Sequence, residues 1–377
     1  MATEITRKIP QAIQSMLWGK AAGRCQFAGC NQPLWKSAVT REQVNIAQKA
    51  HIYAFSAGGP RAKGRPKAIK LNNLNNLILV CHGCHRKIDK DKDGGRYTAE
   101  LLKAWKSDHE QRVERVTGIH PKRASHIVLY GANVGKHSSP LNHEEAAEAM
   151  FPLWYPAEDQ PINLGTVDSS KRDSDPNFWV QNGDDLVAKF NERVRPRLAD
   201  GNIKHLSVFA LAPQPLLILL GTLVTDIQPA VVYQRHREPQ SWKWRKPPKG
   251  FNYIIRPPED KGQKVAVVFS LSASVADDRI TQTLGKDVAI WELTMSSPHN
   301  DFLKSREQLS MFRTEVRRLL NEIKGRHCQS ETLHIFPAMP VSAAVELGRV
   351  RQPKADMPWQ VYDQVNERGG FVPALKL

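Results

Sequence analysis

Four of the five cysteines lie in two close pairs near the start of the chain, and their spacing could hold a metal ion. Four residues separate Cys25 from Cys30, and two separate Cys81 from Cys84. Zinc takes four soft ligands in a tetrahedron at about 2.3 Å, and two tight turns deliver them without strain. We therefore expect a structural Zn²⁺ held by these four thiolates, with two unrelated buried cysteine pairs as the simpler alternative.

Histidines and an asparagine share this part of the chain with the cysteines. The stretch KAHIYAFS supplies His51, and CHGCHRKID supplies His82 and His85. Asn76 lies between them in NNLILVC. Hydrolysis of a phosphodiester needs a group that takes a proton from water and a cation that stabilises the developing charge. A neutral imidazole and a histidine-bound divalent cation supply both.

The order His, Asn, His, with the last His just after Cys-x2-Cys, resembles the HNH endonuclease family over about residues 20–115. The resemblance implies an α+β domain in which two strands and a helix (the ββα-metal motif) grip one divalent cation, Mg²⁺ or another, beside zinc knuckles. It implies that His51 is the general base, that Asn76 orients His51 or bonds near the metal, and that His85 binds the catalytic cation. His82, inside the knuckle, is expected to be incidental.

One position departs from the family pattern. Many HNH enzymes carry Asp directly before the first His as a second metal ligand, whereas this chain has Ala50. Either water and DNA phosphate complete the shell of the cation, or another carboxylate substitutes. Asp89 is the favoured substitute and Glu42 the second choice.

Residues 89–100, DKDKDGGRYTAE, also satisfy the pattern of an EF-hand calcium loop. Its defining positions would be Asp89, Asp91, Asp93, Gly94 and Glu100. However, Arg96 stands where such loops carry an apolar residue, and the incoming helix would have to begin inside the cysteine knuckle. A solvated turn between two helices is the favoured interpretation.

The basic residues are concentrated in the first third of the chain. The 377 residues carry a formal net charge of +16; residues 1–120, with 21 Lys and Arg against 9 Asp and Glu, contribute +12 of it. Such a block predicts binding to nucleic acid, here double-stranded DNA, although a merely soluble basic surface is the alternative. The segment GGPRAKGRPKAIK has the composition of a loop suited to phosphate contacts. Its candidate DNA-binding residues are Arg61, Lys63, Arg65 and Lys67.

Local helix signals divide the chain. Residues 11–22 predict a short helix, and residues 98–117 predict a longer one capped by Thr98. Gly118 and Pro121 end this region, so we expect one domain over residues 1–120 and another over 125–377. The first residues lack the apolar core of a signal peptide, and no apolar run approaches the roughly 20 residues of a membrane span. A cytoplasmic protein without membrane contact is expected.

The second domain has a different pattern, with short continuous apolar runs rich in Val and Ile. Runs of this kind predict strands buried on both faces of a parallel sheet, and hence an α/β fold. Residues 287–338 form a predicted βαβ unit, because apolar residues at helical spacing separate two such runs. We expect two similar α/β halves, one beginning at residue 126 and the other at residue 206. The predicted strands are residues 126–132, 206–212, 264–272, 287–293 and 332–338.

Ligands of open α/β sheets bind where loops leave the carboxyl ends of the strands. Those loops here are GANVGKHSS, APQP, SLSAS and FPAMP, which are rich in small and polar residues. The segment QRHREPQSWKWRKPP adds aromatic and basic side chains that could stack a base and meet a phosphate. The candidate ligand-binding residues are Gln214, Trp242, Arg245, Ser272 and Phe336, each with ordinary core or loop packing as its alternative.

The strings HLSVFALAPQPLLILLG and FPAMPVSAAVELGR, followed by MPWQVYDQ, resemble the SAVED family over about residues 125–377. This resemblance implies two CARF-like, Rossmann-type halves that sense a cyclic oligonucleotide. An HNH nuclease fused to SAVED resembles the effector nucleases of CBASS anti-phage systems. The pairing implies a cyclic di- or trinucleotide messenger, a resting dimer that becomes a tetramer, and degradation of double-stranded DNA.

Two other functions remain open at this level. One is an HNH restriction endonuclease whose C-terminal domain reads DNA, although residues 121–377, with 33 Lys and Arg against 29 Asp and Glu, carry only +4. The other is a non-enzymatic zinc-knuckle regulator that binds DNA and a nucleotide, which would not need His51, Asn76 and His85 together.

Overall fold

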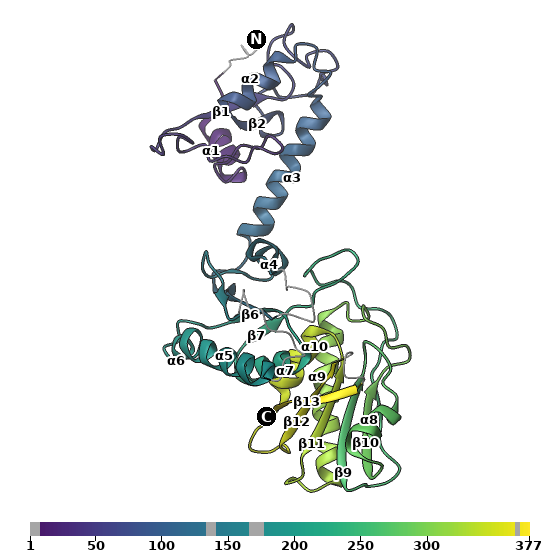
Figure 1. Cartoon of the computed structure of the whole chain (residues 1–377). Coiled ribbons are helices and arrows are strands. Elements are labelled where there is room, and N and C mark those ends of the chain that lie inside the picture. The colour runs from purple at the N-terminus through teal and green to yellow at the C-terminus, as the bar shows by residue number, and fades with distance from the viewer. Residues whose placement is uncertain (1–7, 133–140, 166–176, 366–369) are drawn as a thin grey trace. The chain divides into compact units, whose positions relative to one another are not determined.

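The computed structural model describes residues 8–132, 141–165, 177–365 and 370–377, which fall into two compact units (Figure 1). Unit 1 is Met1–His120 and unit 2 is Pro121–Leu377. No helix in these residues is both long enough and apolar enough to cross a membrane.

Unit 1 is organised around a two-stranded antiparallel sheet that leads directly into a helix. Strand β1 (Ala47–His51) pairs with β2 (Leu77–Cys81), and His51 lies opposite Leu77. Helix α2 (His82–Lys90) begins at the residue after β2. Every residue of β2 is buried, because its apolar run LILV forms the centre of the core of this unit. The result is a ββα motif.

Two further helices pack around this motif. Helix α1 (Gln11–Lys20) contacts β2, and α3 (Ala99–Thr117) contacts α1. The predicted cap of α3 is confirmed, because Thr98 Oγ1 accepts a hydrogen bond from the Leu101 amide at 3.2 Å. The helix predicted over residues 11–22 is present but ends at Lys20.

Unit 2 contains two sheets, and each sheet defines one half of the unit. In the first half the strand order is β4-β3-β6-β7, with β5 also on β3, and every pairing is parallel. Helices α5 and α7 cover one face, and α4 covers the other. The strands are β3 (Ala124–Gly131), β4 (Tyr155–Pro156), β5 (Ile162–Asn163), β6 (Leu206–Leu211) and β7 (Ala230–Val232). The helices are α4 (His143–Met150), α5 (Phe178–Arg193), α6 (Arg195–Ala199) and α7 (Gln214–Val224).

The second half has a six-stranded sheet in the order β13-β12-β11-β9-β10-β8. Its four central strands are parallel, and the two edge strands, β8 and β13, are antiparallel to their neighbours. The strands are β8 (Ile254–Arg256), β9 (Lys264–Ser270), β10 (Val288–Thr294), β11 (Leu333–Ala338), β12 (Trp359–Val365) and β13 (Gly370–Lys376). The helices are α8 (Asp277–Leu284), α9 (Arg306–Arg326) and α10 (Val341–Val350).

The βαβ unit predicted over residues 287–338 is present as β10, α9 and β11. Strands β10 and β11 are both parallel to β9, which lies between them. Helix α9 begins with a capping box, in which the Ser305 and Gln308 side chains each bond the other residue's backbone amide. This arrangement satisfies two amides that a helix start would otherwise leave without partners.

The prediction that the second half begins at residue 206 is wrong. Residues 206–211 form β6, which pairs in parallel with β3 of the first half, with His126 opposite Leu206. A strand that leads into a loop and a helix occurs in every βα unit. The local pattern therefore cannot mark the start of a half, and only the pairing of strands decides it.

Helices α7 and α10 join the two halves at a very close approach. A Cβ atom on Gly221 would lie 2.0 Å from the Val345 carbonyl oxygen, and one on Gly348 would lie 1.9 Å from the Ile218 carbonyl oxygen. Only glycine, which lacks a Cβ, permits two helix backbones to pack at this distance. The Gln214 side chain also accepts a hydrogen bond from the Met339 amide at 3.2 Å, so the two helices begin side by side.

Candidate functional site

The four cysteines of unit 1 come together although 50 residues separate the two pairs. The Sγ atoms of Cys25, Cys30, Cys81 and Cys84 all lie within 4.8 Å of one another, and those of Cys30 and Cys81 are 4.0 Å apart. A tetrahedral metal with sulfur ligands at about 2.3 Å places those sulfurs about 3.8 Å apart. The arrangement therefore fits a tetrahedral metal ion.

The surroundings of these sulfurs also suit a bound cation. The amides of Cys81 and Cys84 point at the Sγ atoms of Cys25 and Cys81, at 3.3 and 3.4 Å. Burial raises the pKa of Cys25 to about 12 and also raises the pKa of Cys84. Without a cation these thiols would stay protonated, so a metal ion is needed to make them thiolates.

His51 is the last residue of β1 and is half-buried. Its Nε2 atom lies 3.1 Å from the Asn72 side-chain oxygen, and its ring packs edge to face on Phe55 at 5.7 Å. The imidazole is thus held at the end of a strand, with Asn72 as a fixed hydrogen-bond partner.

Asn76 is fully buried and holds the segment that follows His51. Its side-chain oxygen accepts a hydrogen bond from the Tyr53 amide at 2.8 Å, and its nitrogen donates to the carbonyls of Tyr53 and Leu71 at 3.2 and 2.9 Å. All its polar groups therefore serve the backbone. The expectation that Asn76 bonds near a metal must be corrected. The alternative, that it orients His51, stays a prediction, because these bonds hold the backbone beyond His51.

His85 lies one turn into α2 and pairs with Asp89 on the same helix face. Its Nδ1 atom is 3.3 Å from Asp89 Oδ2, and 28% of its side chain is exposed. A carboxylate bonded to Nδ1 leaves Nε2 of the imidazole as the atom that can bind a cation. Of the two carboxylates considered in place of Ala50, the structure brings Asp89 to His85. Glu42 instead accepts a hydrogen bond from Thr40.

The other acidic residues of the 89–100 segment do not form a calcium cage. Asp91 accepts hydrogen bonds from the amides of Arg96 and Tyr97, at 3.1 and 2.7 Å, and so closes its own turn. Among the described residues, the four cysteines are the one group of three or more His, Cys, Asp or Glu side chains that converges as metal ligands would. A cation at His85 would accordingly need water or phosphate to complete its shell.

The basic loop of residues 58–70 divides into structural and exposed cations. Arg61 is buried and donates hydrogen bonds to the carbonyls of Ile52 and Tyr97, at 2.6 and 3.3 Å. Arg65 donates to the Ala54 carbonyl at 3.0 Å. Arg61 must be withdrawn from the predicted phosphate contacts, because its guanidinium secures the turn beyond His51. Lys63 and Lys67 are exposed.

A groove runs along this loop and reaches the neighbour of His51. It has a volume of about 660 Å³ and is lined by Arg65, Lys67 and Lys70, together with Asn72. Because Asn72 is bonded to His51, an anionic polymer lying in this groove would pass beside the imidazole.

In unit 2, three of the four predicted ligand loops meet at the carboxyl edge of the strands. Gln214, at the start of α7, bonds Met339 before α10, and the Ser272 amide donates to the Ala338 carbonyl at 2.7 Å. Residues 133–140 of the fourth loop lie outside the described residues. Gln214 and Ser272 are therefore at the predicted edge.

Two other predicted ligand contacts are corrected, and the role of Arg245 stays a prediction. Trp242 is buried against Phe209, with ring centroids 5.2 Å apart. Phe336 is fully buried and stacks on Tyr362 at 4.4 Å. Both are core residues, because each fills an apolar cluster on one face of a sheet. Arg245 is half-buried, and its guanidinium donates to the Pro239 carbonyl at 3.0 Å.

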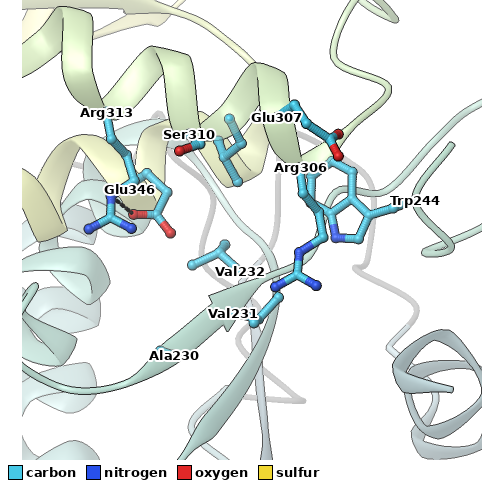
Figure 2. A pocket seen from close by; sticks show the side chains of 10 residues that line it. Ala230, Val231, Val232, Trp244, Arg306, Glu307, Ser310, Arg313 and Glu346 are labelled. Carbon is cyan, nitrogen blue, oxygen red and sulfur yellow. Dashed lines mark ion pairs between the residues drawn. The ribbon is translucent and has the colours of Figure 1, made fainter. Parts of the chain in front are cut away.

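A cavity that the sequence did not predict lies between the two halves of unit 2 (Figure 2). It has a volume of about 340 Å³, with β7 on one side and the first turns of α9 on the other. Trp244, the neighbour of the predicted Trp242 and Arg245, lies on its wall, and Arg306 and Arg313 reach it from α9.

Comparison with known proteins identifies unit 2. The family model described as "SMODS-associated and fused to various effectors sensor domain" (SAVED) matches residues 186–377. The chain belongs to the SAVED family. No curated protein sequence matches it significantly.

Solved structures with similar folds include Cap4 SAVED/CARF-domain containing receptors. The Acinetobacter baumannii receptor with the cyclic trinucleotide 2'3'3'-cAAA is 13% identical, with a TM-score of 0.45, over 73% of this chain and 56% of that chain. The same receptor with 3'3'3'-cAAA is 16% identical, with a TM-score of 0.44, over 78% and 65%. The Moraxella osloensis receptor is 15% identical, with a TM-score of 0.42, over 78% and 60%. The chain thus spans less than two thirds of the length of these receptors.

The SAVED match begins inside α5 and so includes both the carboxyl-edge loops and the cavity at α9. Sequence reasoning missed Arg306 and Arg313 because they lie in an ordinary amphipathic helix, where charged residues are expected to face solvent. A spacing of four and then three residues from Arg306 through Ser310 to Arg313 was the available signal, since it places them on one helix face.

Proposed function

We propose that this protein is a metal-dependent DNA endonuclease that a cyclic oligonucleotide activates through the SAVED domain. The observation that carries the nuclease proposal is the ββα motif of unit 1. It sets His51 at the end of β1, beside the basic groove, and the His85–Asp89 pair on α2. A DNA-binding regulator would need neither a positioned imidazole nor a histidine–carboxylate pair.

In the proposed reaction His51 takes a proton from the attacking water. The proton goes to the ring nitrogen that does not bond Asn72. Asn72 fixes the ring through Nε2, and Asn76 holds the backbone beyond it. His85, through Nε2, would hold Mg²⁺ or another divalent cation, with Asp89 fixing its ring. When bound, this cation would stabilise the negative charge that develops at the phosphate. The exposed Lys67 and Lys70 would hold the DNA backbone.

We further propose that the metal ion at the four cysteines is Zn²⁺ with a structural role. The set offers four sulfur ligands and no open position, which is typical of structural rather than catalytic zinc. It joins the loop of the first cysteine pair to the end of β2 and the start of α2. It would thereby fix the helix that carries His85.

The proposed messenger is a cyclic di- or trinucleotide bound at the carboxyl edge of the strands, and the proposed setting is CBASS-type anti-phage defence. The SAVED family and the cyclic trinucleotides named for the Cap4 receptors support this choice.

A nuclease without sequence preference must rest in an inactive state. A ligand can shift the equilibrium toward the active state only if it binds the active state more tightly than the resting state. We propose a dimer that becomes a tetramer on binding. Light scattering with and without ligand tests this, and an unchanged mass contradicts it.

One cleavage assay tests the enzymatic proposal against its alternatives. Plasmid DNA and Mg²⁺ are incubated with the protein, with and without a panel of cyclic oligonucleotides. His51→Ala should abolish ligand-dependent cutting, whereas His82→Ala, which alters an exposed histidine on the same motif, should not. Constitutive cutting at fixed sites would favour a restriction enzyme. Binding of DNA without cutting under any condition would favour a regulator.

A further inference from the structure

The cavity between β7 and α9 has an unbalanced set of hydrogen-bond donors. Arg306 makes no hydrogen bond or ion pair to any described residue, and Figure 2 shows its guanidinium extending toward Val231. The Trp244 Nε1 atom is buried and has no partner among the described residues. A buried N–H group without an acceptor costs free energy, so a ligand that supplies an acceptor would bind favourably.

The buried acidic residue of the cavity, Glu346, is paired with two arginines, although its Oε2 accepts no hydrogen bond from a described residue. Glu346 is almost fully buried; its Oε1 accepts from Arg349 Nη1 at 2.8 Å, and its Oε2 lies 3.3 Å from Arg313 Nε. Two guanidinium groups thus flank one carboxylate, and Arg306 adds a further positive charge. The charged side chains that line the cavity, Arg306, Arg313, Glu307 and Glu346, sum to zero, but Glu307 is exposed and Glu346 is paired with Arg313 and Arg349. The guanidinium of Arg306 is therefore the group in the cavity that favours an anion.

The remaining wall is the free edge of a sheet. Strand β7 ends the first sheet. The Pro229 carbonyl accepts from the Leu206 amide at 3.0 Å, and the Tyr233 amide donates to the Val208 carbonyl at 2.9 Å. Because backbone groups alternate along a strand, those of Ala230 and Val232 point away from β6. They offer the amide and carbonyl groups that the edge of a nucleobase pairs with.

From these observations we propose that this cavity binds a nucleotide phosphate, with the phosphate on Arg306 and the base against Trp244. Its volume of about 340 Å³ lies at the lower end of the range for small-molecule sites, about 300–1,000 Å³. The site is separate from the carboxyl-edge loops of Gln214 and Ser272. A ligand here would contact β7 of the first half and α9 of the second, and would hold the halves together.

The same phosphate chemistry could come from a free mononucleotide or from a cyclic oligonucleotide, and calorimetry of the full chain separates the two. The probes are 5′-AMP, 5′-GMP, inorganic phosphate, 3′,3′-cyclic di-AMP and 2'3'3'-cAAA. We expect at least one nucleotide to bind, and Arg306→Ala to weaken that binding at least tenfold. Trp244→Phe keeps an aromatic ring at this position but removes the N–H group, and it should weaken nucleotide binding several-fold. Arg318→Ala alters an exposed arginine of the same helix that pairs with Glu315 and Glu322, and should change nothing.

The outcomes keep this proposal distinct from the sensor proposal. Loss of mononucleotide binding in Arg306→Ala assigns the cavity to free nucleotides, and loss of cyclic-oligonucleotide binding alone assigns it to the messenger. The proposal is overturned if Arg306→Ala and Arg318→Ala bind every probe with equal affinity while thermal melting shows that both variants are folded. If a cyclic oligonucleotide still binds in that case and Gln214→Ala weakens it, the sensor function stands without this cavity. If no probe binds the full chain, the proposal for this cavity is also overturned.

Discussion

Unit 1 and unit 2 differ in the interactions that stabilise them. In unit 1 the sheet has two strands, and the core includes Cys25, Cys81 and Cys84 themselves. A two-stranded hairpin is marginal in water, so we propose that this unit depends on cross-linking by a metal ion. Unit 2 instead buries a parallel sheet, a mixed sheet and the α7–α10 contact in one extensive apolar cluster that spans both halves. The packing of this cluster stabilises the unit.

This difference matches the function that we propose for each unit. Chemistry at a phosphodiester needs few side chains fixed on rigid elements, and a metal-stapled ββα motif supplies them with little chain. Sensing a ligand needs a large surface whose two halves can shift against each other. A glycine-mediated helix contact between the halves of unit 2 suits that need, because small shifts there reposition both sheets.

Removal of the metal should have the largest effect and should be confined to unit 1. Structural zinc contributes on the order of 10 kcal/mol to folding. A chelator, or Cys84→Ser, should therefore expose the amides of residues 8–120 in hydrogen exchange and leave unit 2 protected. Cys328→Ser changes an exposed cysteine outside the cluster and is the matched control. Unchanged protection of unit 1 after chelation would show that the two units do not differ in this way.

The second prediction concerns packing in unit 2. Gly348→Ala places a Cβ atom within 1.9 Å of the Ile218 carbonyl oxygen and forces α7 and α10 apart. We expect a loss of about 3 kcal/mol in the free energy of unfolding of unit 2, measured by denaturant titration of the full chain with unit-resolved hydrogen exchange. Gly325→Ala, on α9 with no atom near the added Cβ, should be neutral or slightly stabilising. Equal effects of the two substitutions would refute the close contact.

The third prediction tests the positioning of His85. Asp89→Asn removes the carboxylate that fixes the ring, and we expect ligand-dependent cleavage to fall about 10- to 100-fold. The concentration of Mg²⁺ needed for half-maximal activity should rise, a readout that a general loss of stability would not give. Asp93→Asn, in the exposed turn that follows, is the control. Binding of the cyclic oligonucleotide by unit 2 should be the same in both variants.

The smallest expected effect is the response of unit 2 to acid. Burial, followed by nearby arginines, lowers the pKa of His205 and of His236 to about 4. An unfolded histidine titrates near 6.5, so the unfolded state binds protons first as the pH falls. Stability is therefore complete above pH 6.5 and is lost between pH 6.5 and 4. Each residue should contribute about 1.4 kcal/mol of loss at pH 5.5.

Chemical denaturation of unit 2 at pH 7.5 and 5.5 measures this loss. His236→Gln should remove the part of the pH dependence that His236 contributes. It should leave the part due to His205 and to the other unit 2 histidines whose pKa values are lowered, His126, His327 and His334. If the stability of the His236→Gln variant depends on pH as strongly as that of the original chain, other residues cause the loss of stability in acid.

Much of the local structure could be predicted, because it depends on neighbouring residues. Thr98 caps α3, and the continuous apolar runs form parallel strands. What failed were statements about burial and partners. Trp242, Phe336 and Arg61 have functional residue types, yet each is enclosed by segments distant in sequence. A residue's type does not say whether water or a core surrounds it.

The sequence by itself determined the residue types and spacing of the cysteines, of His51 and of His85. It also determined the SAVED strings and the concentration of positive charge in the first 120 residues. Only the tertiary structure decided that Asn76 serves the backbone and that β6 belongs with β3. Only there do Arg306 and Trp244 face one cavity. The physical reason is that spacing along a chain fixes which groups share a helix or a strand, whereas burial and pairing depend on packing between elements far apart in sequence.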